Sequence, residues 1–148
     1  MRVARLYVML ALAVLGTGVA SYLSATSVFG EQEVVCGPLG DCHAVQNSIY
    51  ADIAGIPVAV LGLGLYLALL AVLTARRWCR PGSAVLTAWT FSLALSGALY
   101  SAYLTYLELF VIDAICAWCV TSAVIVGALF VLSIPDARRQ LPRPEGRA

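Results

Sequence analysis

The stretch AICAWCVTSAVIVGALFVLSIP, residues 114–135, contains no charged side chain. A transmembrane helix needs about 20 consecutive apolar residues to cross a hydrocarbon core of about 30 Å, and this stretch is long enough. Three further charge-free stretches of similar length precede it, at residues 6–30, 53–75 and 81–107. Together they predict an all-α integral membrane protein that folds as a bundle of four transmembrane helices.

The overall composition agrees with a membrane protein. Hydrophobic residues make up 61% of the 148-residue chain and charged residues 11%, whereas a soluble domain carries roughly 25% charged residues. The chain therefore has too few charges to cover a water-facing surface. The net charge of +1 identifies no partner by itself; we expect membrane lipid around the protein and no nucleic acid.

The domain boundaries follow from the ends of the charge-free stretches. The longer stretches exceed what a span needs, so we expect their ends to lie in loops. We expect spans at about residues 6–28, 53–75, 83–107 and 114–134. Residues 29–52 then form an outer loop, which is too short to bury a core of its own. One membrane domain covers residues 1–135, and the Arg- and Pro-rich residues 136–148 are expected to be a disordered cytoplasmic tail.

The arginines set the orientation. All nine basic residues are arginines, gathered in residues 2–5, 76–80 and 138–147. Four spans place these segments on one side, which the positive-inside rule makes cytoplasmic, so both termini lie inside. The first apolar run is longer than the roughly 7–15 residues of a signal-peptide core, so we expect a retained helix.

The cysteines lie almost entirely on the predicted outer side. Cys36 and Cys42 fall in the outer loop, Cys116 and Cys119 fall where the fourth span begins, and Cys79 is cytoplasmic. Disulfides persist in oxidising outer compartments. Four of the five cysteines are therefore placed for thiol–disulfide chemistry, and we interpret Cys79 as a bystander.

Cys116-Ala117-Trp118-Cys119 is a C-x-x-C motif at the start of a predicted helix. Residues i and i+3 share a helix face, so the two sulfurs can meet. A helix N-terminus stabilises an anion and lowers the pKa of a thiol, and the thiolate is the nucleophile in disulfide exchange. Asp113, the expected cap of this helix, would partly oppose that effect.

Other interpretations of this pair stay open. It can be an inert structural disulfide, two buried cysteines acting as small apolar residues, or half of a zinc site built from all four outer cysteines. A disulfide within one helix would tie down little chain. Zinc sites usually combine two short-spaced pairs, whereas the first pair here is C-x5-C. We therefore expect a redox pair and no metal.

Cys36 and Cys42 would by themselves suggest a plain disulfide in a loop. A loop dithiol above a membrane-embedded C-x-x-C is, however, the layout that relays electrons from a soluble protein to an oxidant in lipid. Aromatic side chains are expected to wall the site: Trp118, Tyr100, Tyr103 and Phe110. They suit a lipid-soluble aromatic carrier such as a quinone. His43, Asp41 and Glu108 can tune proton transfer or simply solvate the outer segments.

Two longer runs resemble a known family. They are CHAVQNSIYA at residues 42–51, followed by GIP at 55–57, and YLELFVIDAICAWC at 106–119. Both are similar to bacterial members of the vitamin K epoxide reductase family, and the resemblance extends over roughly residues 6–134. It implies a four-helix bundle around a quinone, either menaquinone or ubiquinone.

The resemblance also implies individual roles. Cys119 faces the quinone and passes electrons to it, and Cys116 exchanges with a loop cysteine, expected to be Cys42. Cys36 then contacts the soluble partner, and Ser48 matches a serine placed to hydrogen-bond near the quinone. The expected quinone contacts are Cys119, Ser48, Trp118, Phe110 and Tyr103.

The implied activity is quinone-dependent reoxidation of a thioredoxin-fold, DsbA-like partner, which supports disulfide formation in exported proteins. Many bacterial members carry a fused thioredoxin-like domain, whereas this sequence ends soon after its fourth span, so we expect a separate partner. The expected location is the bacterial cytoplasmic membrane, with the site facing the periplasm or exterior. Ala123 replaces a tyrosine of the vertebrate enzymes, which disfavours epoxide reduction. The alternatives are a vitamin K epoxide or quinone reductase and a non-catalytic tetraspan scaffold.

Overall fold

The structure is a computed structural model that describes residues 2–29, 45, 51–53, 55–78 and 83–140. Its long helices are α1 (Arg2–Phe29), α3 (Val58–Trp78), α4 (Ala84–Leu107) and α5 (Ala117–Arg138), and α4 runs on into the π-helix η1 (Glu108–Ile112). Within these described ranges, four helical segments are long and apolar enough to cross a membrane. The predicted class, an all-α protein with four transmembrane helices, is confirmed.

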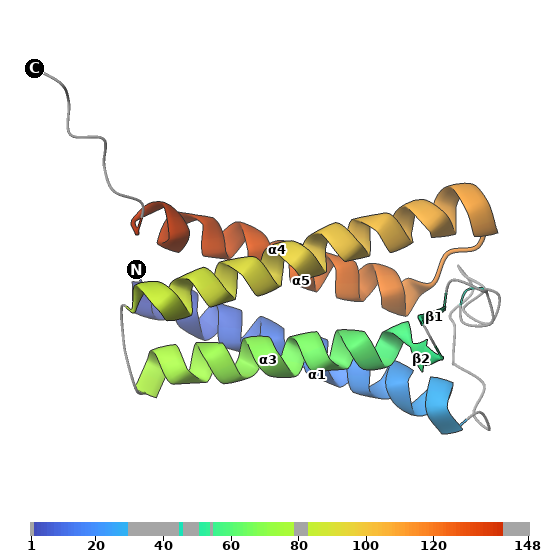
Figure 1. The fold of residues 1–148 in the computed structure, drawn as a ribbon, viewed down its shortest axis with the longest axis horizontal. Helices are drawn as coiled ribbons and strands as arrows, with labels where there is room; N and C mark the ends of the chain where they lie inside the picture. The colour runs from blue at the N-terminus through green and yellow to red at the C-terminus, as the bar shows by residue number, and fades with distance from the viewer. Residues whose placement is uncertain (1, 30–44, 46–50, 54, 79–82, 141–148) are drawn as a thin grey trace, which may run out of the picture.

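The helices lie alongside one another and form a bundle (Figure 1). α1 packs most extensively against α3, and α4 against α5. The first residues of α1 and the last residues of α5 meet at one end of the bundle (Figure 1). In lipid the backbone N–H and C=O groups have no water to bond, and a helix satisfies them within one segment.

Helix α3 begins at Val58, later than the expected start of the second span at residue 53. The intervening residues form a two-stranded antiparallel sheet of β1 (Asp52–Ile53) and β2 (Ile56–Pro57). Gly55 has a φ of 80°, a conformation that glycine adopts without steric cost, and it permits the tight reversal. Pro57, expected in the first helical turn, is therefore the last strand residue.

The interior of the bundle is close-packed around Tyr66 of α3. The buried apolar core comprises Met9, Ala13, Ala20, Tyr66, Leu69, Leu73, Ala94, Ile125, Val126 and Leu129. A Cβ atom at Gly16 of α1 would overlap the Tyr66 ring, and one at Gly97 of α4 would lie 2.5 Å from Leu65 Cδ2. Glycines at these two positions therefore allow the helices to approach closely.

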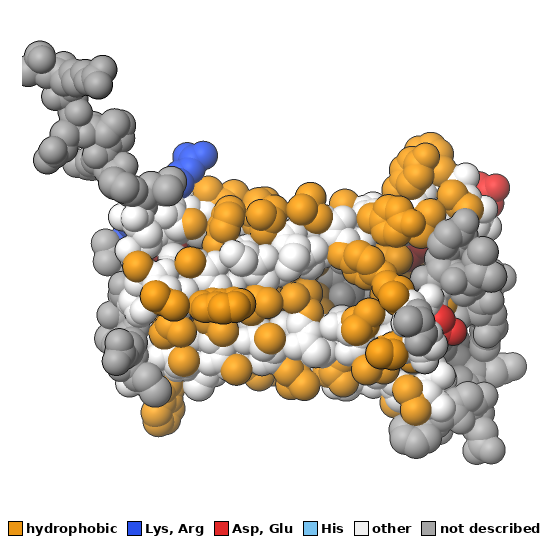
Figure 2. Space-filling model, in the orientation of Figure 1, with side chains coloured by type: hydrophobic (Ala, Val, Ile, Leu, Met, Phe, Trp, Pro, Cys, Tyr) orange, Lys and Arg blue, Asp and Glu red, His pale blue; other side chains and the backbone are white. Residues whose placement is uncertain are grey.

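Hydrophobic side chains also cover the outside of the bundle. Figure 2 shows them spread along its length, with the coloured charged groups near its two ends. Exposed large apolar residues well inside the helices include Val14, Leu67, Leu99 and Val124. A soluble monomer rarely exposes so extended an apolar surface, and contact with lipid accounts for it.

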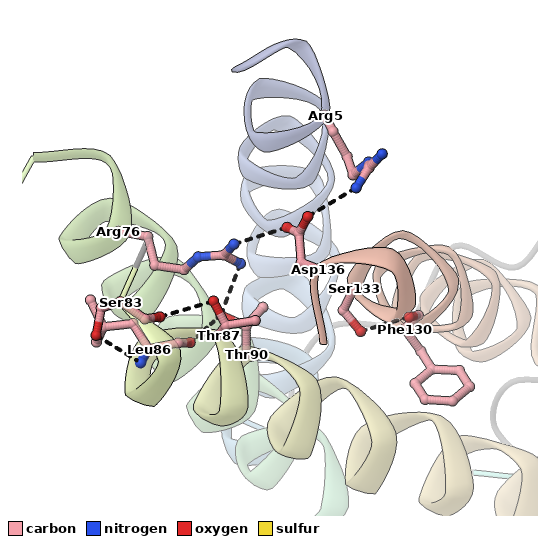
Figure 3. Close-up of polar contacts among 9 residues, drawn as sticks. All are labelled: Arg5, Arg76, Ser83, Leu86, Thr87, Thr90, Phe130, Ser133 and Asp136. Atoms are coloured by element: carbon pink, nitrogen blue, oxygen red, sulfur yellow. Dashed lines mark hydrogen bonds and ion pairs between the residues drawn. The ribbon is translucent and has the colours of Figure 1, made fainter. Parts of the chain in front are cut away.

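A polar network joins all four helices at the end where α1 begins (Figure 3). Asp136 of α5 accepts 2.9 Å hydrogen bonds from Arg5 of α1 and Arg76 of α3. Arg76 also donates to the Thr90 hydroxyl of α4 at 3.4 Å. These side chains are largely shielded from solvent, so their mutual neutralisation makes the burial of charge tolerable.

Candidate redox site

The segment that joins α4 to α5 is irregular. The π-helical turn η1 ends at Asp113, which has left-handed backbone angles (φ 53°, ψ 31°). The backbone N–H groups of Asp113 and Ala114 both donate to the carbonyl oxygen of Glu108. This widened turn reverses the chain within a few residues, and single π-helical turns are frequent at functional sites.

Cys116, not Asp113, is the N-cap of α5. Its backbone is extended (φ −97°, ψ 110°), and its sulfur accepts a hydrogen bond from the backbone N–H of Cys119 at 3.3 Å. Asp113 instead ends η1 and is exposed. The prediction that Asp113 caps this helix is therefore wrong, because the left-handed turn adds an extended segment before α5 begins.

The two sulfurs of the C-x-x-C motif are in contact. Cys119 Sγ lies 2.7 Å from Cys116 Sγ and donates a hydrogen bond to it, and both cysteines are free thiols. Their i, i+3 spacing on one helix produces this contact, as expected from the sequence. The two sulfurs are thus within reach of forming a disulfide with each other.

The surroundings of Cys116 favour its thiolate. Hydrogen bonding from the Cys119 thiol lowers the pKa of the Cys116 thiol, outweighing the opposing effect of burial. The N-terminus of α5 adds partial positive charge at the same place. The Cys116 sulfur is therefore the better nucleophile of the pair for disulfide exchange.

Cys116 is completely buried, at 0% exposure. The partly buried residues around it are Tyr22 of α1, Val45, Trp118 and Cys119. The Tyr22 and Trp118 rings lie 5.0 Å apart between centroids. Val45 comes from the segment between α1 and β1, so this connection contacts the dithiol directly.

Glu108, the first residue of η1, is also buried, with 3% exposure. Its Oε2 atom accepts a hydrogen bond from the backbone N–H of Cys116 at 3.2 Å. Its carboxylate also interacts electrostatically with the Cys119 thiol, and both residues line the same cavity. The sequence left Glu108 open between tuning proton transfer and solvating an outer segment, and it did not predict that this side chain is buried. The π-helical turn that brings it inward left no recognisable signal in the sequence.

A cavity of about 750 Å³ opens beside the dithiol. This volume is within the range of about 300–1,000 Å³ that is typical of small-molecule sites. Its walls are mostly apolar and come from all four helices. They include Leu23, Leu61, Leu65, Tyr66, Gly97, Tyr100, Leu104, Glu108, Cys119, Ser122 and Val126. Cys119 lines this cavity, whereas Cys116 is not among its described lining residues.

The structure brings together some of the expected quinone contacts and separates others. Cys119 and Tyr100 line the cavity. Tyr103 and Phe110 are 51% and 70% exposed and do not belong to its described lining. Trp118 packs against Tyr22 on the Cys116 side. A role for Tyr103, Phe110 and Trp118 in contacting a quinone stays a prediction.

Several predicted residues fall outside the described part of the chain. They are Cys36, Cys42, His43, Ser48 and Cys79. Their assigned roles, including the loop pair and the serine near the quinone, stay predictions from the sequence.

A membrane bundle with a dithiol at the start of one span defines a membrane-embedded redox protein. The sequence model of the Vitamin K epoxide reductase family matches residues 7–134. This match covers most of the 148-residue chain, so the chain belongs to that family. Membership supports an oxidoreductase activity, and the family is in general associated with quinones and redox partners in membranes.

Proposed function

We propose that this protein is a quinone-dependent thiol–disulfide oxidoreductase that reoxidises a separate thioredoxin-fold, DsbA-like protein. One observation carries the proposal. Cys119 contacts Cys116 Sγ and also lines the large cavity, whereas Cys116 is fully buried against Val45 and does not belong to the described cavity lining. The dithiol therefore combines a buried sulfur, packed against a residue of the connection between α1 and β1, with a cysteine that lines the cavity.

The cavity suits a quinone by its size and by its lining. The apolar walls match a lipid-soluble ring, and Glu108, Ser122, Tyr66 and Cys119 supply polar groups. The Tyr66 hydroxyl is held by hydrogen bonds of 2.9 and 3.0 Å to the Ser122 carbonyl and hydroxyl oxygens. A bound quinone would supply a two-electron sink, taking up two protons to become a quinol.

Electrons enter through thiolate exchange. The partner's thiolate attacks the loop disulfide at Cys36, and the partner leaves oxidised. The Cys42 thiolate released by this exchange attacks Cys116 of the Cys116–Cys119 disulfide and releases Cys119 as a thiolate. Cys36 then attacks Cys42 in the mixed disulfide, which restores the loop disulfide and frees Cys116, so the Cys116–Cys119 pair is fully reduced. Re-formation of the Cys116–Cys119 disulfide then releases two electrons into the cavity. The hydrogen bonds to Cys116 Sγ support this sequence, because they stabilise Cys116 as a thiolate.

The proposed orientation puts the dithiol outside the cytoplasm. Asp136 and its arginines lie at one end of the bundle, and η1 and the dithiol lie at the other (Figures 1 and 3). With the arginine-rich end in the cytoplasm of a bacterium, the dithiol faces the periplasm or exterior. Labelling of intact cells with a membrane-impermeant maleimide tests this: Cys36 should react, and Cys79 only after permeabilisation.

The activity test uses the purified protein, a reduced thioredoxin-fold dithiol, and menaquinone or ubiquinone analogues. The loss of quinone absorbance is followed for wild type, Cys119→Ala and the control Cys79→Ala. Turnover by wild type and Cys79→Ala, but not by Cys119→Ala, supports the proposal. Absence of turnover with either quinone class, in a folded wild-type protein, rejects it and favours the non-catalytic scaffold.

A further inference from the structure

Glu108 is a carboxylate buried within a span, and its charge has no cationic partner in the described structure. The ion pairs found among the described residues both involve Asp136, at the opposite end of the bundle. An ionisable side chain inside a membrane is costly and is by default a candidate for function. Asp136 is explained by its two arginines; Glu108 has no such structural explanation.

The contacts of Glu108 instead converge on the dithiol. One oxygen accepts the Cys116 backbone N–H, which fixes the carboxylate against the N-terminus of α5. The same carboxylate is within reach of the Cys119 thiol, and both Glu108 and Cys119 line the cavity. The backbone carbonyl of Glu108 accepts from Asp113 and Ala114, so the residue is held from both its main chain and its side chain.

Cys119 must lose its proton before it can donate electrons, and a nearby carboxylate can accept that proton. Its thiol is the hydrogen-bond donor of the pair and Cys116 Sγ the acceptor, so Cys119 keeps its proton in the dithiol. A sulfur becomes an effective electron donor as the thiolate. The proton on Cys119 must therefore leave before electrons pass into the cavity, and Glu108 is the carboxylate within reach in the described structure.

We propose that Glu108 is a catalytic proton carrier, which accepts the proton of Cys119 and delivers it into the cavity. The second half of this role rests on the proposed function, because it requires the quinone. The S–H bond of Cys119 breaks, and Glu108 becomes a neutral carboxylic acid. Two electrons leave as the Cys116–Cys119 disulfide forms. Glu108 then gives its proton to one quinone oxygen and returns to the carboxylate.

The second proton of the quinol enters from water and replaces the one that Cys116 released on ionising. The overall balance is one dithiol and one quinone in, one disulfide and one quinol out. The other titratable groups that line the cavity are Asp52, Tyr66 and Tyr100. Within the described residues, none of these three side chains hydrogen-bonds to either cysteine.

The variant Glu108→Gln tests whether Glu108 acts by transferring a proton or only by its structural contact with Cys116. The amide oxygen still accepts the Cys116 N–H, but the side chain cannot take up a proton. Glu108→Asp keeps a carboxylate on a shorter stem, and Asp113→Asn is the matched control. Asp113 is exposed on the same connection, and asparagine tolerates its left-handed backbone.

The first readout needs no quinone. In a Cys116→Ser background, serine keeps the helix cap, and the rate of Cys119 alkylation by N-ethylmaleimide is followed by peptide mass spectrometry. We expect Glu108→Gln to slow this reaction about tenfold or more, and Glu108→Asp to recover part of the rate. Asp113→Asn should react like its parent. Equal alkylation rates in the Gln variant and its parent would overturn the proposal.

The second readout measures the two halves of the catalytic cycle separately, in a chain that carries only the Glu108 substitution. One half is electron transfer to quinone, and the other is reduction by the partner dithiol. Prereduced Glu108→Gln should pass electrons to quinone about 100-fold more slowly than wild type, as expected for loss of a general base. Reduction of the oxidised variant by the partner dithiol should stay within about twofold of wild type. Equal slowing of both halves would show a structural role and overturn the proposal. If wild type reduces no quinone while Cys119 alkylation depends on Glu108, the proposed function fails and the role of Glu108 as the base for Cys119 stands.

Discussion

Cys119 Sγ lies 2.7 Å from Cys116 Sγ, yet of these two residues only Cys119 belongs to the described lining of the cavity. This asymmetry predicts different products from removing each sulfur. In Cys119→Ser, Cys116 can still exchange with the loop but has no second sulfur to release it. We expect a disulfide between Cys116 and Cys42 to accumulate, and quinone reduction to fall to background.

In Cys116→Ser the loop cysteine loses its target, so no such cross-link should form, although quinone reduction is lost as well. Non-reducing peptide mapping by mass spectrometry distinguishes the two variants. A cross-link from the loop to Cys119 in Cys116→Ser, as abundant as the one in Cys119→Ser, would contradict the assigned order of transfer.

The lowered pKa of Cys116 gives a second prediction. Its leading cause is hydrogen bonding from the Cys119 thiol, opposed by burial. Because the pKa is lowered, Cys116 carries more thiolate near neutral pH than an ordinary cysteine. Cys119→Ala removes the thiol donor, so the pKa of Cys116 should rise and its reactivity should move to higher pH.

The measurement is the rate of Cys116 alkylation by iodoacetamide as a function of pH, with Cys116 resolved by peptide mass spectrometry. The midpoint should be higher in Cys119→Ala than in the prereduced wild type. Cys79→Ala serves as the control and should leave the midpoint unchanged. An unaltered midpoint in Cys119→Ala would show that the helix N-terminus, rather than the thiol donor, sets the acidity of Cys116.

Two glycines of α3 offer a matched test of the cavity. A Cβ atom at Gly62 or at Gly64 would meet nothing within 4 Å, but Gly62 lines the cavity and Gly64 is exposed outside it. Replacing either glycine in a helix improves helix propensity by roughly 1 kcal/mol. Gly62→Leu should therefore fold well, occupy part of the cavity and raise the KM for quinone about tenfold, which corresponds to about 1.4 kcal/mol.

Gly64→Leu adds the same side chain on the lipid side and should leave the KM for quinone close to that of wild type. Steady-state quinone reduction at saturating partner dithiol measures both constants. If the two variants give equal KM values, the cavity beside Cys119 is not the quinone site.

The helices and the dithiol could be read from the sequence because their signals are local. Runs without charge mark the spans, and the i, i+3 spacing of Cys116 and Cys119 puts their sulfurs on one face. The sequence allows a role in proton transfer for Glu108 but does not predict that its side chain is buried. That burial depends on the π-helical turn and the left-handed Asp113, which no periodicity announces.

The aromatic residues show a second limit of the sequence. Tyr100 and Tyr103 lie a turn apart on α4, with ring centroids 6.3 Å apart, but Tyr100 lines the cavity and Tyr103 is exposed. In a membrane helix both the lipid-facing and the bundle-facing surfaces are apolar, so hydrophobicity does not identify the inner face. The placement of each aromatic depends on helix rotation within the bundle, which packing decides.

The polar network at the far end of the bundle gives a prediction about stability. Asp136 neutralises both Arg5 and Arg76, and the three side chains are mostly shielded from solvent. In Asp136→Asn two guanidinium groups stay close together without a counter-charge. Removing one partner of a buried ion pair costs about 3–5 kcal/mol. Because this network retains some exposure, we expect a loss of about 2 kcal/mol and a lower Tm in detergent.

The control is Arg139→Gln, which removes an exposed charge near the same helix end and should leave the Tm within about 1 °C, as usual for surface substitutions. The dithiol lies at the other end of the bundle, so Asp136→Asn should keep its quinone reduction per folded molecule below its Tm. Loss of activity at full folding would instead mean that the polar network couples to the dithiol through the helices. An unchanged Tm would show that solvent stabilises the charges of Arg5 and Arg76 well enough for the fold to be equally stable without Asp136.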